Sequence, residues 1–172
     1  EAIIVDYPMM RALLRCAIGN DDSALDSGEP RDHRSMPTRI PPELARSWLL
    51  VPGNAPDRFD EAATSPADAV VLDLEDAVPG TEKPAARDAV VARLRDGGTA
   101  WVRINDATTP FWADDLEALA GLGGLEGVML AKTESGHQVE ATCERLPEGT
   151  RILVLIESAM GLEAAPEIAR AD

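Results

Sequence analysis

Five short, continuously apolar runs rich in branched residues recur along the chain after residue 46. They occupy residues 47–51, 69–74, 100–105, 127–132 and 151–157. Continuous apolar runs of this length are typical of parallel strands that are covered on both faces. The pattern therefore predicts five buried strands.

Segments with helical character separate these runs, at residues 56–64, 82–94, 112–119, 137–146 and 159–169. Strands that alternate with helices predict βαβ units and a parallel sheet. The repeat of about 25 to 30 residues suits a (β/α)8 TIM-barrel type fold, an α/β class, with about the first five units present. An open doubly wound sheet is the alternative. The first strand–helix turn, however, reads P-G-N-A-P over residues 52–56, which lacks the G-x-G-x-x-G dinucleotide fingerprint.

Residues 1–45 differ from the rest of the chain. Residues 3–14 could form a short helix, although Pro8 lies in its middle, and the polar, proline-containing run that follows has few apolar side chains. Too little apolar surface leaves the entropy of ordering without compensation. We predict a flexible leader over residues 1–45 and a partial barrel domain over residues 46–172. Because the chain begins with Glu1, we also expect a fragment or a processed product.

The charge balance limits the partners. The 172 residues carry 31 acidic and 16 basic side chains, a formal net charge of −15. Nucleic acid needs a basic surface, so it is disfavoured, whereas a small anion held by a few arginines is not. No apolar run approaches the ~20 residues of a membrane span, and residues 1–10 lack the features of a secretory signal. We expect a cytoplasmic protein with neither nucleic acid nor a membrane as partner.

Polar side chains follow four of the five predicted strands. They are Asp73, Glu75 and Asp76; Arg103 and Asn105; Lys132 and Glu134; and Glu157 and Ser158. In a parallel barrel the carboxyl ends of all strands face the same way, and active sites lie on that face. Residues that are distant in sequence are therefore expected to converge on one site.

The residue types at these positions indicate a chemistry. Glu157 could be a hard oxygen ligand of Mg²⁺, which takes one or two protein carboxylates and keeps several waters. Arg103 could bind a carboxylate through its planar fork. A metal ion and an arginine together would stabilise an enolate. The alternatives are an ion pair between strands for Arg103, a structural salt bridge for Glu157, surface exposure for Lys132, and a solvated strand end for the acidic residues 73–76.

Five segments resemble the motifs of one family. Residues 46–54 read R-S-W-L-L-V-P-G-N, similar to the R-S-x-L-F-V-P-G-N opening of the HpcH/HpaI aldolase or citrate lyase β-subunit family. Residues 72–78 resemble its L-D-L-E-D-x-V, and Lys83 with Arg87 matches the K-x-x-A-R that follows. Residues 102–105 resemble V-R-[IV]-N, and residues 156–161 resemble I-E-T-A-x-G. The resemblance covers residues 46–172.

The resemblance implies an oligomeric (β/α)8 barrel that acts on a CoA thioester of a hydroxy acid. Such enzymes cleave citryl-CoA, malyl-CoA or citramalyl-CoA into acetyl-CoA and a 2-oxo acid, or run the reverse condensation. Carried over by motif, Arg103 binds substrate and Glu157 binds Mg²⁺ and substrate. Glu75 and Asp76 line the site as catalytic residues. Arg46 or Arg58 could meet the phosphates of CoA.

The sequence also departs from the family pattern. Ala131 stands where the family has proline before the lysine, Ser158 replaces a threonine, and the second metal ligand is expected beyond residue 172. A pyruvate-type aldolase acting on free acids is an alternative. A truncated, non-catalytic chain is another, and for it we expect aggregation through an exposed edge strand.

Overall fold

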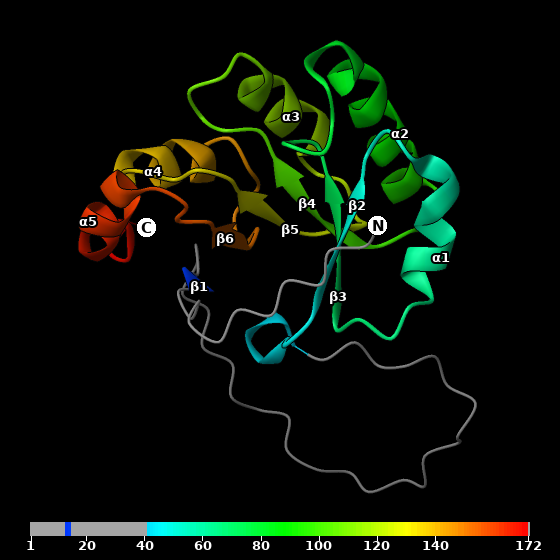
Figure 1. Ribbon diagram of the computed structural model, residues 1–172, viewed down its shortest axis with the longest axis horizontal. Helices are drawn as coiled ribbons and strands as arrows, with labels where there is room; N and C mark the ends of the chain where they lie inside the picture. The colour runs from blue at the N-terminus through cyan, green and yellow to red at the C-terminus, as the bar shows by residue number, and fades with distance from the viewer. Residues whose placement is uncertain (1–12, 15–40, 172) are drawn as a thin grey trace, which may run out of the picture.

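The computed structural model describes residues 13–14 and 41–171, and a six-stranded sheet forms its centre (Figure 1). The strand order is β1-β6-β5-β4-β3-β2. The strands are β1 (Leu13–Leu14), β2 (Trp48–Pro52), β3 (Ala69–Asp73), β4 (Ala100–Ile104), β5 (Leu125–Leu130) and β6 (Ile152–Val154). Strands β2 to β6 are parallel, and each overlaps a predicted run. The prediction of a parallel α/β fold is confirmed.

The helices form a second layer along one side of the curved sheet (Figure 1). They are α1 (Phe59–Ala63), α2 (Lys83–Arg95), α3 (Phe111–Leu119), α4 (Gly136–Cys143) and α5 (Ala159–Ile168), with 3-10 turns η1 (Pro42–Leu44), η2 (Pro56–Arg58) and η3 (Gly80–Glu82). Each α-helix falls on a predicted segment. Parallel strands that follow their sequence order, with helices on one face, form a segment of a barrel wall. A doubly wound sheet would reverse its strand order and carry helices on both faces.

The two faces of the sheet pack differently because successive strand residues point to opposite sides. Leu72, Val102 and Leu130 face the helices and belong to the larger core. On the opposite face, Trp101 is fully buried and meets Trp48 edge-on with ring centroids 5.3 Å apart. This smaller cluster lies on the concave face, which corresponds to the interior of a barrel.

One expectation for residues 1–45 is wrong. Leu13 and Leu14 lie in a strand, antiparallel to β6, and not in the short helix that residues 3–14 could form. Pairing with Leu153 and Ile152 holds both residues extended. Residues 1–12 and 15–40 lie outside the described part, so the predicted flexible leader is tested no further. None of the described helices is long and apolar enough to cross a membrane.

Candidate active site

An ion pair between two strands organises the carboxyl edge of the sheet. Asp73 ends β3 and is the register partner of Arg103 in β4. Arg103 donates from Nε to Asp73 Oδ1 at 2.7 Å and from Nη2 to Oδ2 at 2.6 Å, a bidentate arrangement. Asp73 is buried and also accepts hydrogen bonds from the amides of Glu75 and Ala77. One carboxylate therefore both orients the arginine and shapes the turn after β3.

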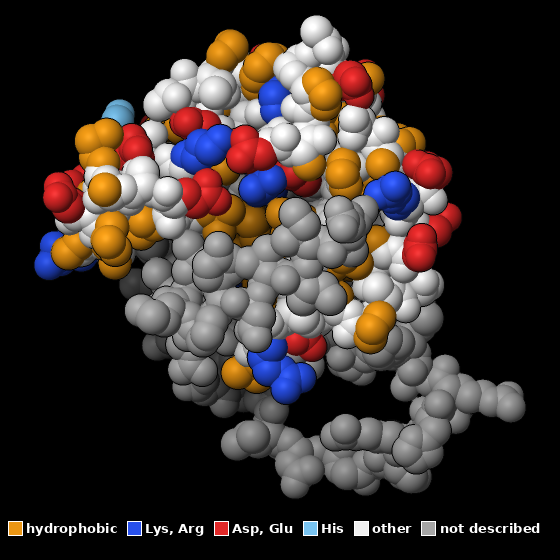
Figure 2. Space-filling view, viewed as in Figure 1, with side chains coloured by type: hydrophobic (Ala, Val, Ile, Leu, Met, Phe, Trp, Pro, Cys, Tyr) orange, Lys and Arg blue, Asp and Glu red, His pale blue; other side chains and the backbone are white. Residues whose placement is uncertain are grey.

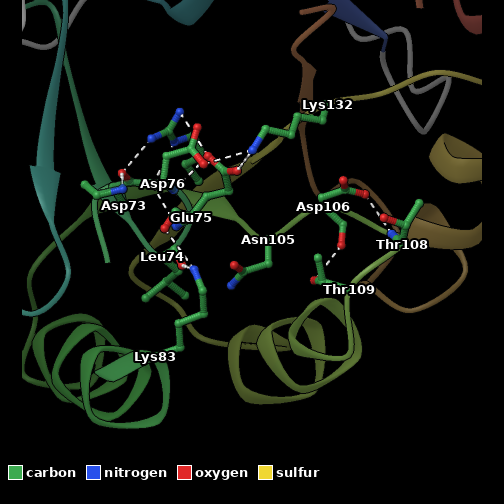
Figure 3. Close-up of polar contacts among 12 residues, drawn as sticks. Asp73, Leu74, Glu75, Asp76, Lys83, Asn105, Asp106, Thr108, Thr109 and Lys132 are labelled. Atoms are coloured by element: carbon green, nitrogen blue, oxygen red, sulfur yellow. Dashed lines mark hydrogen bonds and ion pairs between the residues drawn. The ribbon is translucent and has the colours of Figure 1, made fainter. Parts of the chain in front are cut away.

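Lys83 holds the same turn from the side of helix α2. Its Nζ donates to the carbonyl oxygens of Leu74 and Glu75, each at 2.8 Å (Figure 3). Lys83 starts α2, and its ammonium also lies 5.5 Å from the centroid of the Phe111 ring. Burial lowers the pKa of Lys83, and the nearby acidic groups oppose that shift. These hydrogen bonds fix the backbone that carries Glu75 and Asp76 from the side of helix α2.

Lys132, in the turn that follows β5, reaches across to the two carboxylates after β3 (Figure 3). Its Nζ lies 2.5 Å from Glu75 Oε1 and 2.8 Å from Asp76 Oδ1. Burial raises the pKa of Glu75, against the hydrogen bond from Lys132, whereas that same lysine lowers the pKa of Asp76. The hydrogen bonds that Lys132 donates to Asp76 and Glu75 raise its own pKa. Two adjacent carboxylates therefore have pKa values shifted in opposite directions, an arrangement common at sites of proton transfer.

A second network lies next to the first and is centred on the buried carboxylate of Asp115. Asp115 of α3 accepts hydrogen bonds from the backbone amide of Asn105 at 3.0 Å, from Asn105 Nδ2 at 2.6 Å and from Arg87 Nε at 2.8 Å. Asn105 follows β4, so this network fixes the loop that leaves the candidate site. Asn105 and Arg87 belong to recognisable motifs, whereas Asp115 was not predicted, since an acidic residue next to Asp114 in a helix gives no signal of burial.

Glu157 lies at the same edge, after β6, and is exposed. Within the described part of the chain, no hydrogen bond or ion pair engages its carboxylate. The neighbouring Ser158 donates from Oγ to Glu134 Oε1 at 2.6 Å and accepts from the amide of Gly161 at 3.1 Å, which caps helix α5. The short β6–α5 connection thereby holds Glu157 at a fixed place on the edge.

The donor set around Glu157 fits a hard cation in part. No group of three or more His, Cys, Asp or Glu side chains that could hold a metal occurs among the described residues. A closed structural zinc site is therefore absent from this part of the chain. Mg²⁺ differs, because it keeps several waters and takes only one or two protein carboxylates. One unpaired carboxylate at the edge matches that requirement.

The two arginines predicted to meet CoA lie at opposite edges. Arg58 ends η2, after the carboxyl end of β2, and is exposed. Arg46 precedes the amino end of β2, where Asp68 accepts hydrogen bonds from its backbone amide and from that of Ser47. The structure thus brings together Arg103, Glu75 and Asp76, and places Arg58 and Glu157 on the same edge. It does not bring Arg46 there, and the CoA role of Arg46 stays a prediction.

Basic and acidic side chains lie next to one another in the upper part of the face that Figure 2 shows. The chain as a whole is strongly acidic, with a net charge of −15. An anionic ligand therefore needs local cations, and Arg103 and Lys132 provide them at the carboxyl edge. Lys132 follows a predicted strand, and its contacts with Glu75 and Asp76 place it in the candidate site.

Residues 46–172 match the family described as HpcH/HpaI aldolase/citrate lyase. The chain belongs to this family. Among curated relatives, a citrate lyase subunit beta-like protein of Mycobacterium tuberculosis is 45% identical over 125 residues, covering 73% of this chain and 43% of the relative. The L-malyl-CoA/beta-methylmalyl-CoA lyase of Rhodobacter capsulatus is 35% identical over 146 residues, covering 76% of this chain and 46% of the relative. The chain thus spans slightly under half the length of these relatives.

Solved structures give the same assignment and support the barrel-type fold. A citrate lyase beta subunit from M. tuberculosis, complexed with oxaloacetate and magnesium, superposes with a TM-score of 0.61 at 46% identity, covering 73% of this chain and 53% of that one. The CitE protein of the same organism, in complex with magnesium, acetoacetate and coenzyme A, gives a TM-score of 0.60 at 46% identity. That match covers 73% of this chain and 44% of the other.

Proposed function

We propose that this chain carries part of the active site of a Mg²⁺-dependent carbon–carbon lyase acting on a CoA thioester. The substrate class is a hydroxyacyl-CoA of the citryl-CoA, malyl-CoA or citramalyl-CoA type, and the products are acetyl-CoA and a 2-oxo acid. The observation that carries the proposal is the shared edge of Arg103, a fixed cationic fork, and Glu157, an exposed carboxylate. The relatives crystallised with magnesium, an oxo acid and coenzyme A support it.

Each residue has a role in this proposal. Glu157 would hold Mg²⁺, which supplies Lewis acid stabilisation of the oxo acid when bound. Arg103 binds the carboxylate of the 2-oxo acid portion through the N–H groups that Asp73 leaves available. Glu75 and Asp76 line the site, and Arg58 meets the phosphates of CoA at the rim.

The reaction in the cleavage direction needs three changes. A base removes the proton of the substrate hydroxyl, and the carbonyl of the 2-oxo acid forms. The electrons of the broken carbon–carbon bond pass to the thioester, and the resulting enolate takes up a proton to give acetyl-CoA. Arg103 stabilises the ground-state carboxylate and the charge that develops beside it, because a preorganised cation needs no reorganisation during the reaction.

Isothermal titration of the chain with Mg²⁺ and either oxaloacetate or pyruvate tests this proposal. Glu157→Ala is expected to abolish Mg²⁺-dependent binding of the oxo acid, because it removes the proposed ligand. Glu163→Ala, an exposed acidic residue of α5, is the matched control and should bind as the wild type does. Unchanged binding in Glu157→Ala, or oxo acid binding that does not require Mg²⁺, would refute the assignment.

A CoA titration distinguishes the thioester lyase from an aldolase of free acids. In the lyase, CoA is expected to bind the wild type, and Arg58→Met should weaken that binding because a cation at the rim is lost. If the wild type gives no heat of binding with CoA, the result would favour the free-acid aldolase. The Mg²⁺ and oxo acid experiment would then still stand, since it tests a separate part of the site.

A further inference from the structure

Lys132 lies where the pairing of β5 with β6 is interrupted. Leu155 donates from its amide to the carbonyl of Leu130, and the amide of Thr133 donates to the carbonyl of Leu155, each at 2.9 Å. In a regular parallel ladder the amide of residue 132 would reach that carbonyl. One extra residue therefore lies between these two hydrogen bonds, in the turn at Ala131 and Lys132 that follows β5, an irregularity of the β-bulge kind.

The backbone of Lys132 adopts a conformation that suits glycine better than lysine. Its φ is +50°, and no other residue except glycine has a positive φ in the described part of the chain. A side chain with a Cβ strains the backbone in this region. Bulges of this kind occur beside active sites, where they re-aim a side chain. The strain at Lys132 thus accompanies a specific direction of its side chain.

That direction takes the ammonium to the turn after β3, where it binds both carboxylates. Each oxygen of Glu75 then has a partner, since Oε1 accepts from Lys132 and Oε2 accepts from the amide of Asp76 at 2.8 Å. Nη1 of Arg103 lies 3.4 Å from Glu75 Oε2, a distant contact compared with the 2.6 Å and 2.7 Å bonds to Asp73. Glu75 therefore engages Lys132 closely and Arg103 only loosely.

No other lysine in the described residues can take over this role. Lys83 donates only to the backbone carbonyls of the turn, on the side of helix α2. If Lys132 were removed, Arg103 would be the one basic side chain in contact with both Asp73 and the buried Glu75. Its Nη1 would then be drawn to Glu75, because Oε1 would lose its partner and a buried charge without its ion pair is costly.

We propose that Lys132 is a positioning residue: by holding Glu75 and Asp76, it leaves Nη1 of Arg103 available for the carboxylate of the 2-oxo acid. The inference rests on the proposed function, in which Arg103 binds that carboxylate. Lys132 itself need not touch the ligand, although 41% of its side chain is exposed. Its contribution acts through Glu75.

Titration of pyruvate with Mg²⁺ into the wild type and three variants tests the proposal. Lys132→Met is expected to bind the oxo acid about tenfold or more weakly, the effect of losing one charge-assisted hydrogen bond at Arg103. Lys132→Arg keeps the cation and should recover most of the affinity. Arg170→Met, which removes a cation after α5, is the matched control and should bind as the wild type does. Wild-type affinity in Lys132→Met would overturn the proposal.

Lys132→Gly separates positioning from stability. Glycine adopts a φ of +50° without strain, so this variant should melt at a higher temperature than Lys132→Met. Its oxo acid affinity should nevertheless be as low as that of Lys132→Met, because both lack the ammonium. Affinity that follows the melting temperature would show a purely structural role and would overturn the proposal.

A carbon-detected NMR titration of the Glu75 carboxylate gives a readout that does not depend on ligand binding. The pKa of Glu75 is expected to rise further in Lys132→Met than in the wild type, since burial remains and its nearest cation is gone. An unchanged pKa would overturn the proposal. If the wild type binds no oxo acid, the proposed function fails. The NMR titration then still decides whether Lys132 sets the pKa of Glu75.

Discussion

Replacing Asp115 by alanine should destabilise the chain more than any change at its surface. The carboxylate is 1% exposed and accepts three hydrogen bonds, two from Asn105 and one from Arg87, whose side chain is 12% exposed. Exposed ion pairs contribute about 0–1 kcal/mol. Removing one partner of a buried pair costs about 3–5 kcal/mol, because the remaining donors stay buried without acceptors. Because Asp115 is buried, we expect Asp115→Ala to cost about 3–5 kcal/mol.

Asp114→Ala is the matched control, since the neighbouring residue carries the same charge and also faces Arg87. Its carboxylate is 61% exposed and lies 3.5 Å from Arg87 Nη2, which makes no hydrogen bond to it. We expect a loss below about 0.5 kcal/mol. The loss of stability in Asp115→Asn should fall between those of Asp115→Ala and Asp114→Ala, because the amide keeps one acceptor oxygen but turns an NH₂ group toward donors.

Urea unfolding followed by circular dichroism measures these differences as shifts of the midpoint at a constant slope. Small domains have a free energy of unfolding of about 5–15 kcal/mol, so Asp115→Ala removes a large share of it. Should that variant not fold, Asp115→Asn remains measurable against Asp114→Ala. Equal stability of Asp115→Ala and Asp114→Ala, within about 1 kcal/mol, would show that this network does not hold α2, α3 and β4 together.

Two further changes test the carboxyl edge and the concave face. Burial raises the pKa of Glu75 in the folded chain above its unfolded pKa of 4.5. The neutral form therefore contributes its full stability below pH 4.5, and this contribution is lost as the pH rises through the folded pKa. Glu75→Gln should therefore gain stability relative to the wild type in thermal melts from about pH 4 to about pH 7; a pH-independent difference would contradict this. Gly127→Ala would place a Cβ 2.5 Å from the Trp101 ring and 2.8 Å from a backbone carbonyl, so it should cost about 1–3 kcal/mol in urea unfolding. Gly80→Ala, where a Cβ meets nothing within 4 Å, should be near neutral, and equal losses would refute the packing argument.

The apolar runs predicted the parallel strands because burial on both faces leaves a strong local pattern. The predicted run at residues 100–105 differs from β4 (Ala100–Ile104) by one residue. The predicted run at residues 127–132 begins two residues after the start of β5, because Leu125 and Glu126 are one apolar and one acidic residue and do not continue the apolar run. The helix expected over residues 3–14 failed at Leu13–Leu14, where pairing with a strand far along the chain overrides local preference.

The residues of the candidate site could be predicted only from the rule that the carboxyl ends of parallel strands converge. Sequence order indicated that Glu75, Asp76 and Arg103 would meet, and the structure confirms their proximity. It could not show that Asp73 takes both arms of the Arg103 fork, because register sets that pairing. Nor could it show the bulge at Lys132, since lysine has no preference for a positive φ. Such features depend on contacts between residues far apart in sequence.

The consecutive order of the parallel strands also bears on how the fold is reached. Each strand from β3 to β6 lies beside the strand that precedes it in the chain, so these pairings join residues that are 21 to 30 positions apart, against 140 positions for Leu13 and Leu153. The entropic cost of closing a loop grows with its length, so the pairings between consecutive strands form more readily than one that spans most of the chain. During synthesis, every new strand–helix unit can dock on the unit already formed. The pairing of β1 with β6 is different, because Leu13 must wait until Leu153 has been made. We therefore expect that pairing to form last.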